Sequence, residues 1–176
     1  FYLQMISMHC RLHAEPGADL LHTSTASFQN TPYYLTTSLN IGLDDTLNSY
    51  RQGFCGKANF DQWALSLASL DHRLSLHYQE QYARFWSLRF NIAEWLIETH
   101  HIQQAIPILA DTWQQGIKAD MPLVGLALAG ALIKTGQIKM GESTLQELSR
   151  ITADAPPEFR TKMQQLQQQT QQEHQP

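Results

Sequence analysis

Few residues of this sequence have the type and spacing needed for chemistry, and one group of them lies near its start. His9 and His13 are four residues apart, so a helix would place both imidazoles on one face, close to Cys10. Two such imidazoles can bind Zn or Cu, but a stable site needs a third or fourth ligand, and His22 is the only one nearby. We therefore predict no metal and no cofactor, and keep a metal-dependent enzyme only as a lesser alternative.

A second group of ionisable residues lies in the middle of the sequence. Glu94 and Glu98 are also four residues apart, and two carboxylates on one helix face could act as acid and base in a cleft. On a surface helix such a pair more often forms a solvated edge. The histidines that follow fall in a predicted turn and could contribute to a binding surface. We predict no catalytic residue, and the candidate binding residues are Arg89, Glu94, Glu98, His100 and His101.

The common catalytic motifs are absent from the sequence. The run from Gly130 to Gly136 contains Lys-Thr, but Ile133 stands where a phosphate-binding loop requires glycine. This run also lies within a predicted helix, whose backbone amides are already hydrogen-bonded and cannot hold a phosphate. No GxSxG, HExxH or GxGxxG motif occurs.

Composition excludes several functional classes. The 176 residues include 12 Lys and Arg against 16 Asp and Glu, and the net charge of −4 argues against a nucleic-acid binder that relies on positive charge. A hydrophobic content of 43% is too high for a disordered chain. Charged residues make up only 16%, against about 25% in typical proteins. The length suits one domain with a hydrophobic core.

Hydrophobic periodicity predicts an all-α fold. Leucines at helical spacing ahead of Gly53 predict a helix that begins at Thr31-Pro32. Residues 78–98 carry aromatic side chains all around, so we expect a helix that is buried on more than one side. No run with the period of a β-strand occurs. Between these segments, one apolar stripe predicts a further helix through Phe60, Trp63, Ala64, Leu67, Leu70 and Leu74.

The strongest pattern is an internal repeat, in which residues 92–121 align with residues 128–157 at an offset of 36. Leu and Ile recur at matched positions and would fill the space between two helices. Each copy predicts a helix, a tight turn, a second helix and a loop with Pro, and such hairpins must stack to bury both faces. Small residues that allow close helix approach also recur, at Ala93/Ala129 and Ala105/Gly141.

The second copy resembles a tetratricopeptide repeat. Its large and small residues follow that family's pattern, and Gly136 matches the usual glycine between the two helices. The first copy departs from it, because His100 replaces this glycine and Arg89 occupies the usual Trp position. The offset of 36 also exceeds the family's period of about 34. The resemblance covers residues 86–157 and implies antiparallel hairpins stacked as a short α-solenoid, which would bind a protein or peptide partner without catalysis.

Together these patterns predict a single all-α domain over residues 1–162. Residues 1–85 would form an N-terminal helical cap and loop region, and residues 86–157 the two tetratricopeptide-like units. Eight of the 20 glutamines lie between Gln164 and Gln175. Because so polar a segment can bury little, we expect residues 163–176 to form a Gln-rich flexible tail.

The first residue and the two cysteines predict the cellular location. The sequence starts at Phe1 without an initiator Met, so we expect a processed chain or fragment whose preceding segment could anchor it in a membrane. Cys10 and Cys55 could form a disulfide in an oxidising compartment. This bond would close a loop of about 45 residues and stabilise the fold by about 3–4 kcal/mol.

The layout is also faintly similar to the soluble C-terminal domain of bacterial membrane O-antigen polymerases, ligases and protein O-oligosaccharyltransferases. This resemblance implies a domain on the periplasmic side of the inner membrane that assists glycan assembly. The alternative is a cytoplasmic scaffold or chaperone-type adaptor, with free cysteines and a peptide bound in its groove.

Overall fold

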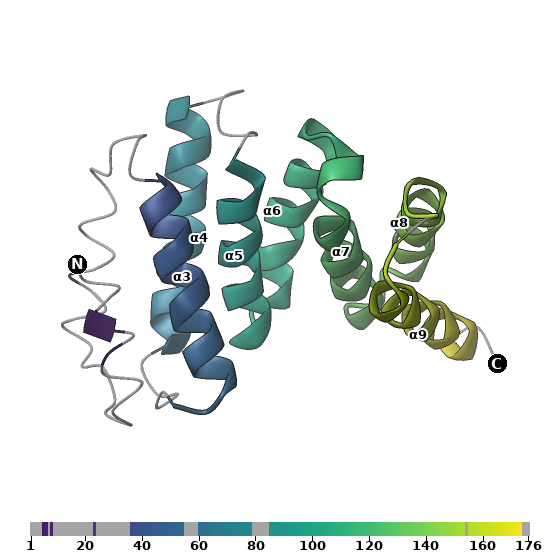
Figure 1. Cartoon of the computed structure of the whole chain (residues 1–176), viewed down its shortest axis with the longest axis horizontal. Coiled ribbons are helices and arrows are strands. Elements are labelled where there is room, and N and C mark those ends of the chain that lie inside the picture. Colours follow the sequence, from purple (N-terminus) through teal and green to yellow (C-terminus); the bar gives the residue numbers. More distant parts are fainter. Residues whose placement is uncertain are drawn as a thin grey trace. The chain divides into compact units, whose positions relative to one another are not determined.

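The fold is all-α, as the periodicity predicts. The computed structural model describes residues 5–6, 8, 23, 36–54, 60–78, 85–153 and 155–173, and these contain helices and turns but no strand. The expected helix start at Thr31-Pro32 and the residues His9, Cys10, His13, His22 and Cys55 lie outside these ranges. The described elements are α3 (Thr36–Arg51), α4 (Phe60–Tyr78), α5 (Trp86–Glu98), α6 (Ile102–Gln115), the 3₁₀ helix η3 (Lys118–Asp120), α7 (Pro122–Lys134), α8 (Ile138–Ile151) and α9 (Pro157–Glu173) (Figure 1).

The contacts divide the chain into two compact units, Phe1–His101 and Ile102–Pro176. The sequence predicted one domain over 1–162 with an internal boundary after residue 85. The boundary of the units instead lies at the turn between α5 and α6, inside the first predicted repeat copy. Within the described segments, no helix is long and apolar enough to cross a membrane.

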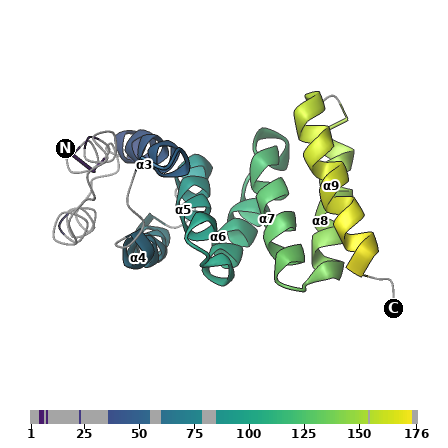
Figure 2. The ribbon, with the colours of Figure 1, turned by 90° about the horizontal axis from the view of Figure 1, so that it is seen from below.

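In the first unit, α5 packs against both α3 and α4 (Figures 1 and 2). The predicted α4 stripe is confirmed, because all six of its apolar side chains are at most 7% exposed. The helix predicted over residues 78–98 begins instead at Trp86, and residue 78 belongs to α4. Its burial on more than one side is confirmed, since more than half of the 13 residues of α5 are buried. Asp44 and Asp45 of α3 face solvent between its buried leucines.

Trp95 of α5 joins this helix to α3 and α4. Its ring stacks on Phe60 of α4 with centroids 5.2 Å apart, and meets Trp63 edge-on at 4.7 Å. Tyr50 of α3 packs against the same ring at 5.2 Å. The indole N–H donates a 3.1 Å hydrogen bond to the carbonyl of Leu43, so this fully buried side chain keeps its polar group satisfied.

In the second unit, α7 contacts α6, α8 and α9 and is buried on most sides. Small residues let the helices approach closely. A Cβ added at Gly125 would lie 2.7 Å from the Trp113 ring of α6, and one at Gly141 would lie 2.7 Å from Ile133 of α7. The predicted role of small residues in close helix packing is therefore confirmed at Gly141.

The prediction of a flexible tail from Met163 was wrong as far as Glu173, because these residues belong to α9. This helix packs on both α7 and α8 (Figure 2). Phe159, Met163, Leu166 and Thr170 are spaced so that they share one face, and three of these four residues are at most 9% exposed. The glutamines cover mainly the opposite, solvent-facing side, so they do not prevent helix formation.

Three helices end with the same backbone geometry. α3, α5 and α7 are each followed by a residue in the left-handed region, at Gly53 (φ 75°), His100 (φ 66°) and Gly136 (φ 78°). In each case this residue donates to the carbonyl three residues back, and the next residue donates to the carbonyl five residues back. The longer-range bond measures 3.0 Å after α3, 2.7 Å after α5 and 2.8 Å after α7. The last two ends are 36 residues apart, as the sequence repeat predicts.

A polar cluster fixes one end of α8 to the segment that follows α6. Glu147 accepts hydrogen bonds from Trp113 Nε1 at 3.1 Å and from Lys118 Nζ at 2.5 Å, and the ammonium lies 5.4 Å from the Trp113 ring centroid. The hydrogen bond from Lys118 is the main cause of a lowered pKa of Glu147. Partial burial opposes it, and the bond from Trp113 and the charges of Lys118 and Arg150 reinforce it.

The two glycines inside α7 provide a matched test of the close packing. We expect Gly125→Ala to destabilise the protein by about 1–3 kcal/mol, because the added methyl would overlap the buried Trp113 ring. Gly130→Ala meets only Leu166 at 3.7 Å, so it should stabilise the helix by about 0.5–1 kcal/mol. Urea unfolding of both variants measures the difference, and equal effects would contradict the packing.

The Glu147 cluster predicts a specific pH dependence. Because the folded-state pKa of Glu147 lies below its usual 4.5, its stabilisation is present above pH 4.5 and is lost as the pH falls through the folded pKa. Glu147→Gln should therefore lower the urea midpoint at neutral pH, and this deficit should shrink in acid. Glu142→Gln on the same helix is the matched control. A deficit that does not depend on pH would exclude the ion pair as its source.

Candidate functional site

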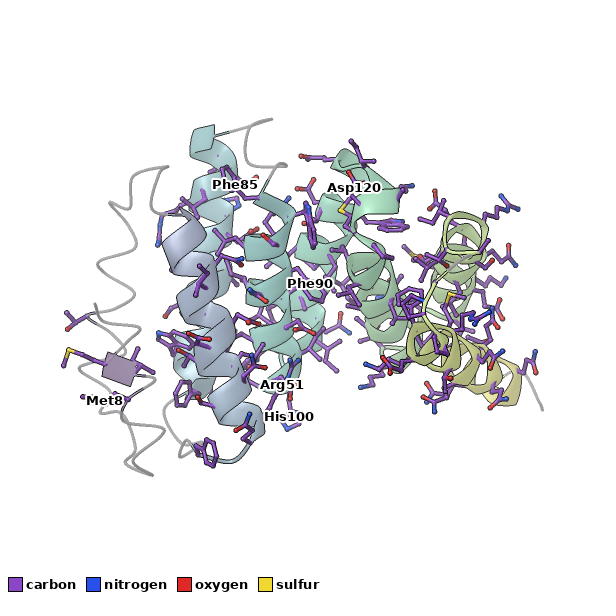
Figure 3. All side chains as sticks on the ribbon, viewed as in Figure 1. Met8, Arg51, Phe85, Phe90, His100 and Asp120 are labelled. Carbon is purple, nitrogen blue, oxygen red and sulfur yellow. The ribbon has the colours of Figure 1, made fainter. Side chains whose placement is uncertain are left out.

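Four of the five predicted binding residues gather where α3 and α5 end and α4 begins. A pocket of about 370 Å³ lies there, lined by Tyr50, Arg51, Asp61, Glu98, Thr99 and His100. We call it the α3–α5 pocket. Arg51 and His100 lie at the same end of the unit, and Phe85 lies at the opposite end (Figure 3).

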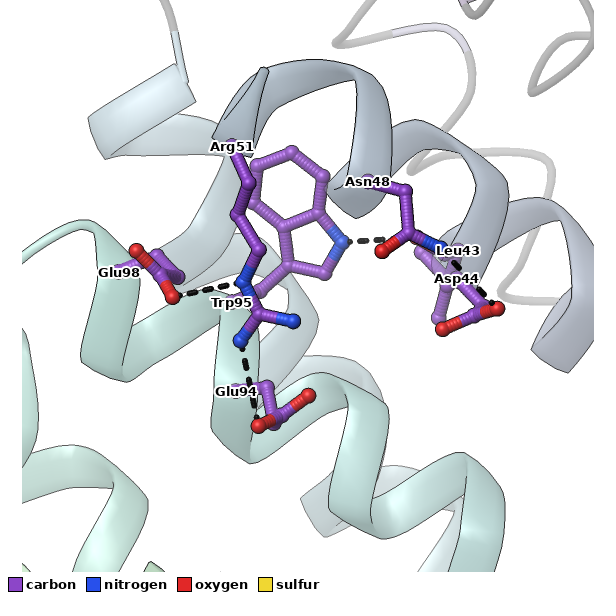
Figure 4. A network of polar contacts seen from close by, with 7 residues as sticks. All are labelled: Leu43, Asp44, Asn48, Arg51, Glu94, Trp95 and Glu98. Atoms are coloured by element: carbon purple, nitrogen blue, oxygen red, sulfur yellow. Dashed lines mark hydrogen bonds and ion pairs between the residues drawn. The ribbon is translucent and has the colours of Figure 1, made fainter. Parts of the chain in front are cut away.

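Arg51 joins the two carboxylates of α5 to α3 (Figure 4). Its Nε lies 2.7 Å from Glu98 Oε1, and its Nη2 lies 3.2 Å from Glu94 Oε1. All three side chains are partly exposed, between 23% and 37%. The predicted pairing of Glu94 and Glu98 on one face is confirmed, and this face is turned toward α3, where one guanidinium binds both.

The charges at the pocket change the pKa values of two of its residues. Burial alone would lower the pKa of Arg51, but its hydrogen bonds to Glu98 and Glu94 and the charges of both carboxylates outweigh burial and raise the pKa. Burial also raises the pKa of Tyr50, and the negative charges of Glu98 and Asp61 add to this effect. Both groups therefore keep their protons well above neutral pH.

His101 lies beside the pocket and faces α4. Its Nε2 is 3.0 Å from Asp61 Oδ1, although the two atoms are not aligned for a hydrogen bond and this buried nitrogen has no hydrogen-bond partner among the described residues. The Asp61 side chain is 65% exposed, whereas that of His101 is 20% exposed. The carboxylate therefore remains accessible from solvent.

His100 has the conformation that glycine occupies at the two equivalent helix ends. It is the only described non-glycine residue with a positive φ, and a side chain in this region costs about 1–2 kcal/mol. Its exposed imidazole gains no burial in return. A strained residue that lines a pocket is a reasonable candidate for a functional one.

Arg89 was wrong as a candidate binding residue. Only 3% of it is exposed, and its Nε and Nη2 bind the two oxygens of Asp71 at 3.0 and 3.2 Å. Burying two charges is tolerable only with such bidentate geometry, so this pair acts inside the packing of α4 on α5. A guanidinium in this position cannot reach a ligand.

Sequence reasoning missed four residues of the pocket, namely Tyr50, Arg51, Asp61 and Thr99. Each follows an ordinary helical pattern, and Arg51 is more than 40 residues from its carboxylate partners. Only the packing of α5 on α3 and α4 brings them together. Within the described ranges, no three His, Cys, Asp or Glu side chains are placed to hold a metal ion.

The pocket carries excess negative charge. Among the described residues that line it, Arg51 contributes one positive charge, while Asp61 and Glu98 contribute two negative ones, so the sum is 1 − 2 = −1 with neutral imidazoles. Glu94, which binds Arg51, adds a further negative charge beside the pocket. α3 and α5 end here and α4 begins here, so the partial negative charges of two helix C-termini outweigh the partial positive charge of one N-terminus. The arrangement therefore favours cations over anions.

Replacing His100 tests whether its backbone is strained. We expect His100→Gly to raise the free energy of unfolding by about 1 kcal/mol, because glycine adopts positive φ without strain. His100→Ala separates loss of the imidazole from relief of strain and should leave stability nearly unchanged. Gly136→Ala should lower the free energy of unfolding by about 1 kcal/mol. No neighbouring atom lies within 4 Å of the added Cβ, so this loss comes from the positive φ alone. Equal stability of the two His100 variants would contradict the strain.

Comparison with known proteins identifies no significant relative of this chain. No family model matches the sequence, and neither a curated protein nor a solved structure is significantly similar to the chain.

Proposed function

We propose that this chain is a non-catalytic, tetratricopeptide-like interaction domain that binds a protein or peptide partner. The observation that carries the proposal is the common geometry of the ends of α3, α5 and α7. Recurrence of one helix-end geometry along the chain is compatible with a repeat architecture, and such architectures present rigid surfaces to partners.

The position of α9 supports the same interpretation. It packs on α7 and α8, as α5 packs on α3 and α4, so it takes the place that the first helix of a further repeat would have. Its outer face consists largely of exposed glutamine. Repeat proteins need such a polar terminal helix, because an apolar outer face would be left uncovered.

The chemistry of the candidate acid–base pair also favours binding over catalysis. A general base must accept a proton from a substrate, but Glu94 and Glu98 both bind Arg51. Their arrangement joins two helices and leaves neither carboxylate poised as a base. The compartment and the link to glycan assembly stay predictions from the sequence.

A selection of peptides tests the proposed function without assuming a ligand. The full chain is immobilised and exposed to a random peptide library displayed on phage, with an unrelated helical protein as the control surface. We expect peptides that share a motif, bind this chain alone and compete with one another for it. Failure to enrich any common motif would contradict an interaction domain that recognises peptides.

A further inference from the structure

We propose that the α3–α5 pocket binds the guanidinium or ammonium group of an arginine or lysine side chain in the partner. This inference rests on the proposed function and names the chemistry that the partner must present. Three features of the pocket carry it, namely its size, its aromatic wall and its charge.

The size of the pocket suits a single side chain. Ligand pockets usually measure about 300–1,000 Å³, and this one, at about 370 Å³, lies near the lower limit. It can take up the end of an extended side chain but not a folded element. A peptide would therefore lie across the helix ends and insert one residue.

Tyr50 gives the pocket a rigid and polar wall. Only 8% of this residue is exposed, and its ring is held between Phe60 at 5.4 Å and Trp95 at 5.2 Å. The phenol keeps its proton at neutral pH, so its oxygen is an uncharged acceptor. Because the ring is fixed before binding, little side-chain entropy is lost when a ligand enters.

The charges select a cation. Arg51 donates through Nε and Nη2 to Glu98 and Glu94, so it is already neutralised and offers an anion little attraction. Asp61, on the other side, is exposed, and His101 beside it is not aligned to form a hydrogen bond with it. An entering guanidinium could form charge-assisted hydrogen bonds with Asp61 and Glu98, whereas a carboxylate or phosphate would be repelled.

NMR titration of the full chain with N-acetyl-arginine amide tests this inference. The matched probe is N-acetyl-citrulline amide, which has nearly the same shape without the charge. We expect the arginine probe to shift the amide resonances of Tyr50, Asp61 and His100 in a saturable way, and the citrulline probe to leave them unchanged. Equal shifts with both probes, or shifts confined to other residues, would overturn the proposal.

Asp61→Asn supplies the second arm of the test. This side chain is 65% exposed, so the substitution should preserve the fold, which the spectrum of the variant verifies. We expect about tenfold weaker binding of the arginine probe, which corresponds to about 1.4 kcal/mol, because the neutral amide no longer offers a hydrogen bond to a charged acceptor. Glu142→Gln makes the same change of charge on α8 and should leave the affinity unchanged.

Equal affinities of the wild type and Asp61→Asn would remove the pocket as the cation site. Such a result would leave the interaction domain itself standing if the phage library still yields a common motif. Conversely, if the library yields no motif while the arginine probe binds in the pocket, the cation site stands and the peptide-binding function is contradicted.

Discussion

The burial of Trp95 is the interaction on which the first unit depends. One indole ring contacts Tyr50, Phe60 and Trp63, and its N–H binds a carbonyl of α3. These contacts fix the direction of α5 relative to both neighbouring helices. The position of the α3–α5 pocket follows from this packing. Glu94 and Glu98 lie close to Trp95 in the sequence, and they reach Arg51 because the Trp95 ring is packed against α3 and α4.

In the second unit, the packing of the neighbouring helices depends on α7 in a similar way. Here small residues, rather than one large ring, allow the close contacts. It is apolar around most of its circumference, so α6, α8 and α9 must each cover a part of it. Gly125 admits the Trp113 ring on one side, and Gly141 of α8 admits Ile133 on another. α7 contributes to the low content of charged residues, since Lys134 is its single charged residue and it has no broad solvated face.

The predictions that succeeded depended on local periodicity. The α4 stripe and the buried α5 follow from residues within one or two helical turns, and the turn at His100 follows from the alignment of the two repeat copies. The buried Arg89–Asp71 pair and the Arg51 contacts could not be predicted, because each joins residues from different helices. The tail prediction failed for another reason. Glutamine is a good helix former, and four side chains on one face of α9 suffice to attach it to α7 and α8.

The pocket lies at helix ends because packing against other helices already covers most of the sides of α5. The sides of α5 are occupied by apolar packing and by the buried Arg89–Asp71 pair, which leaves few places for accessible polar groups. A helix end differs, because its last carbonyls and the following turn remain near solvent and tolerate charge. Glycine would relieve the strain at this turn, as it does after α3 and α7, yet the chain has a histidine whose side chain lines the pocket. The strain at His100 therefore supports the proposal that its side chain has a role in the pocket.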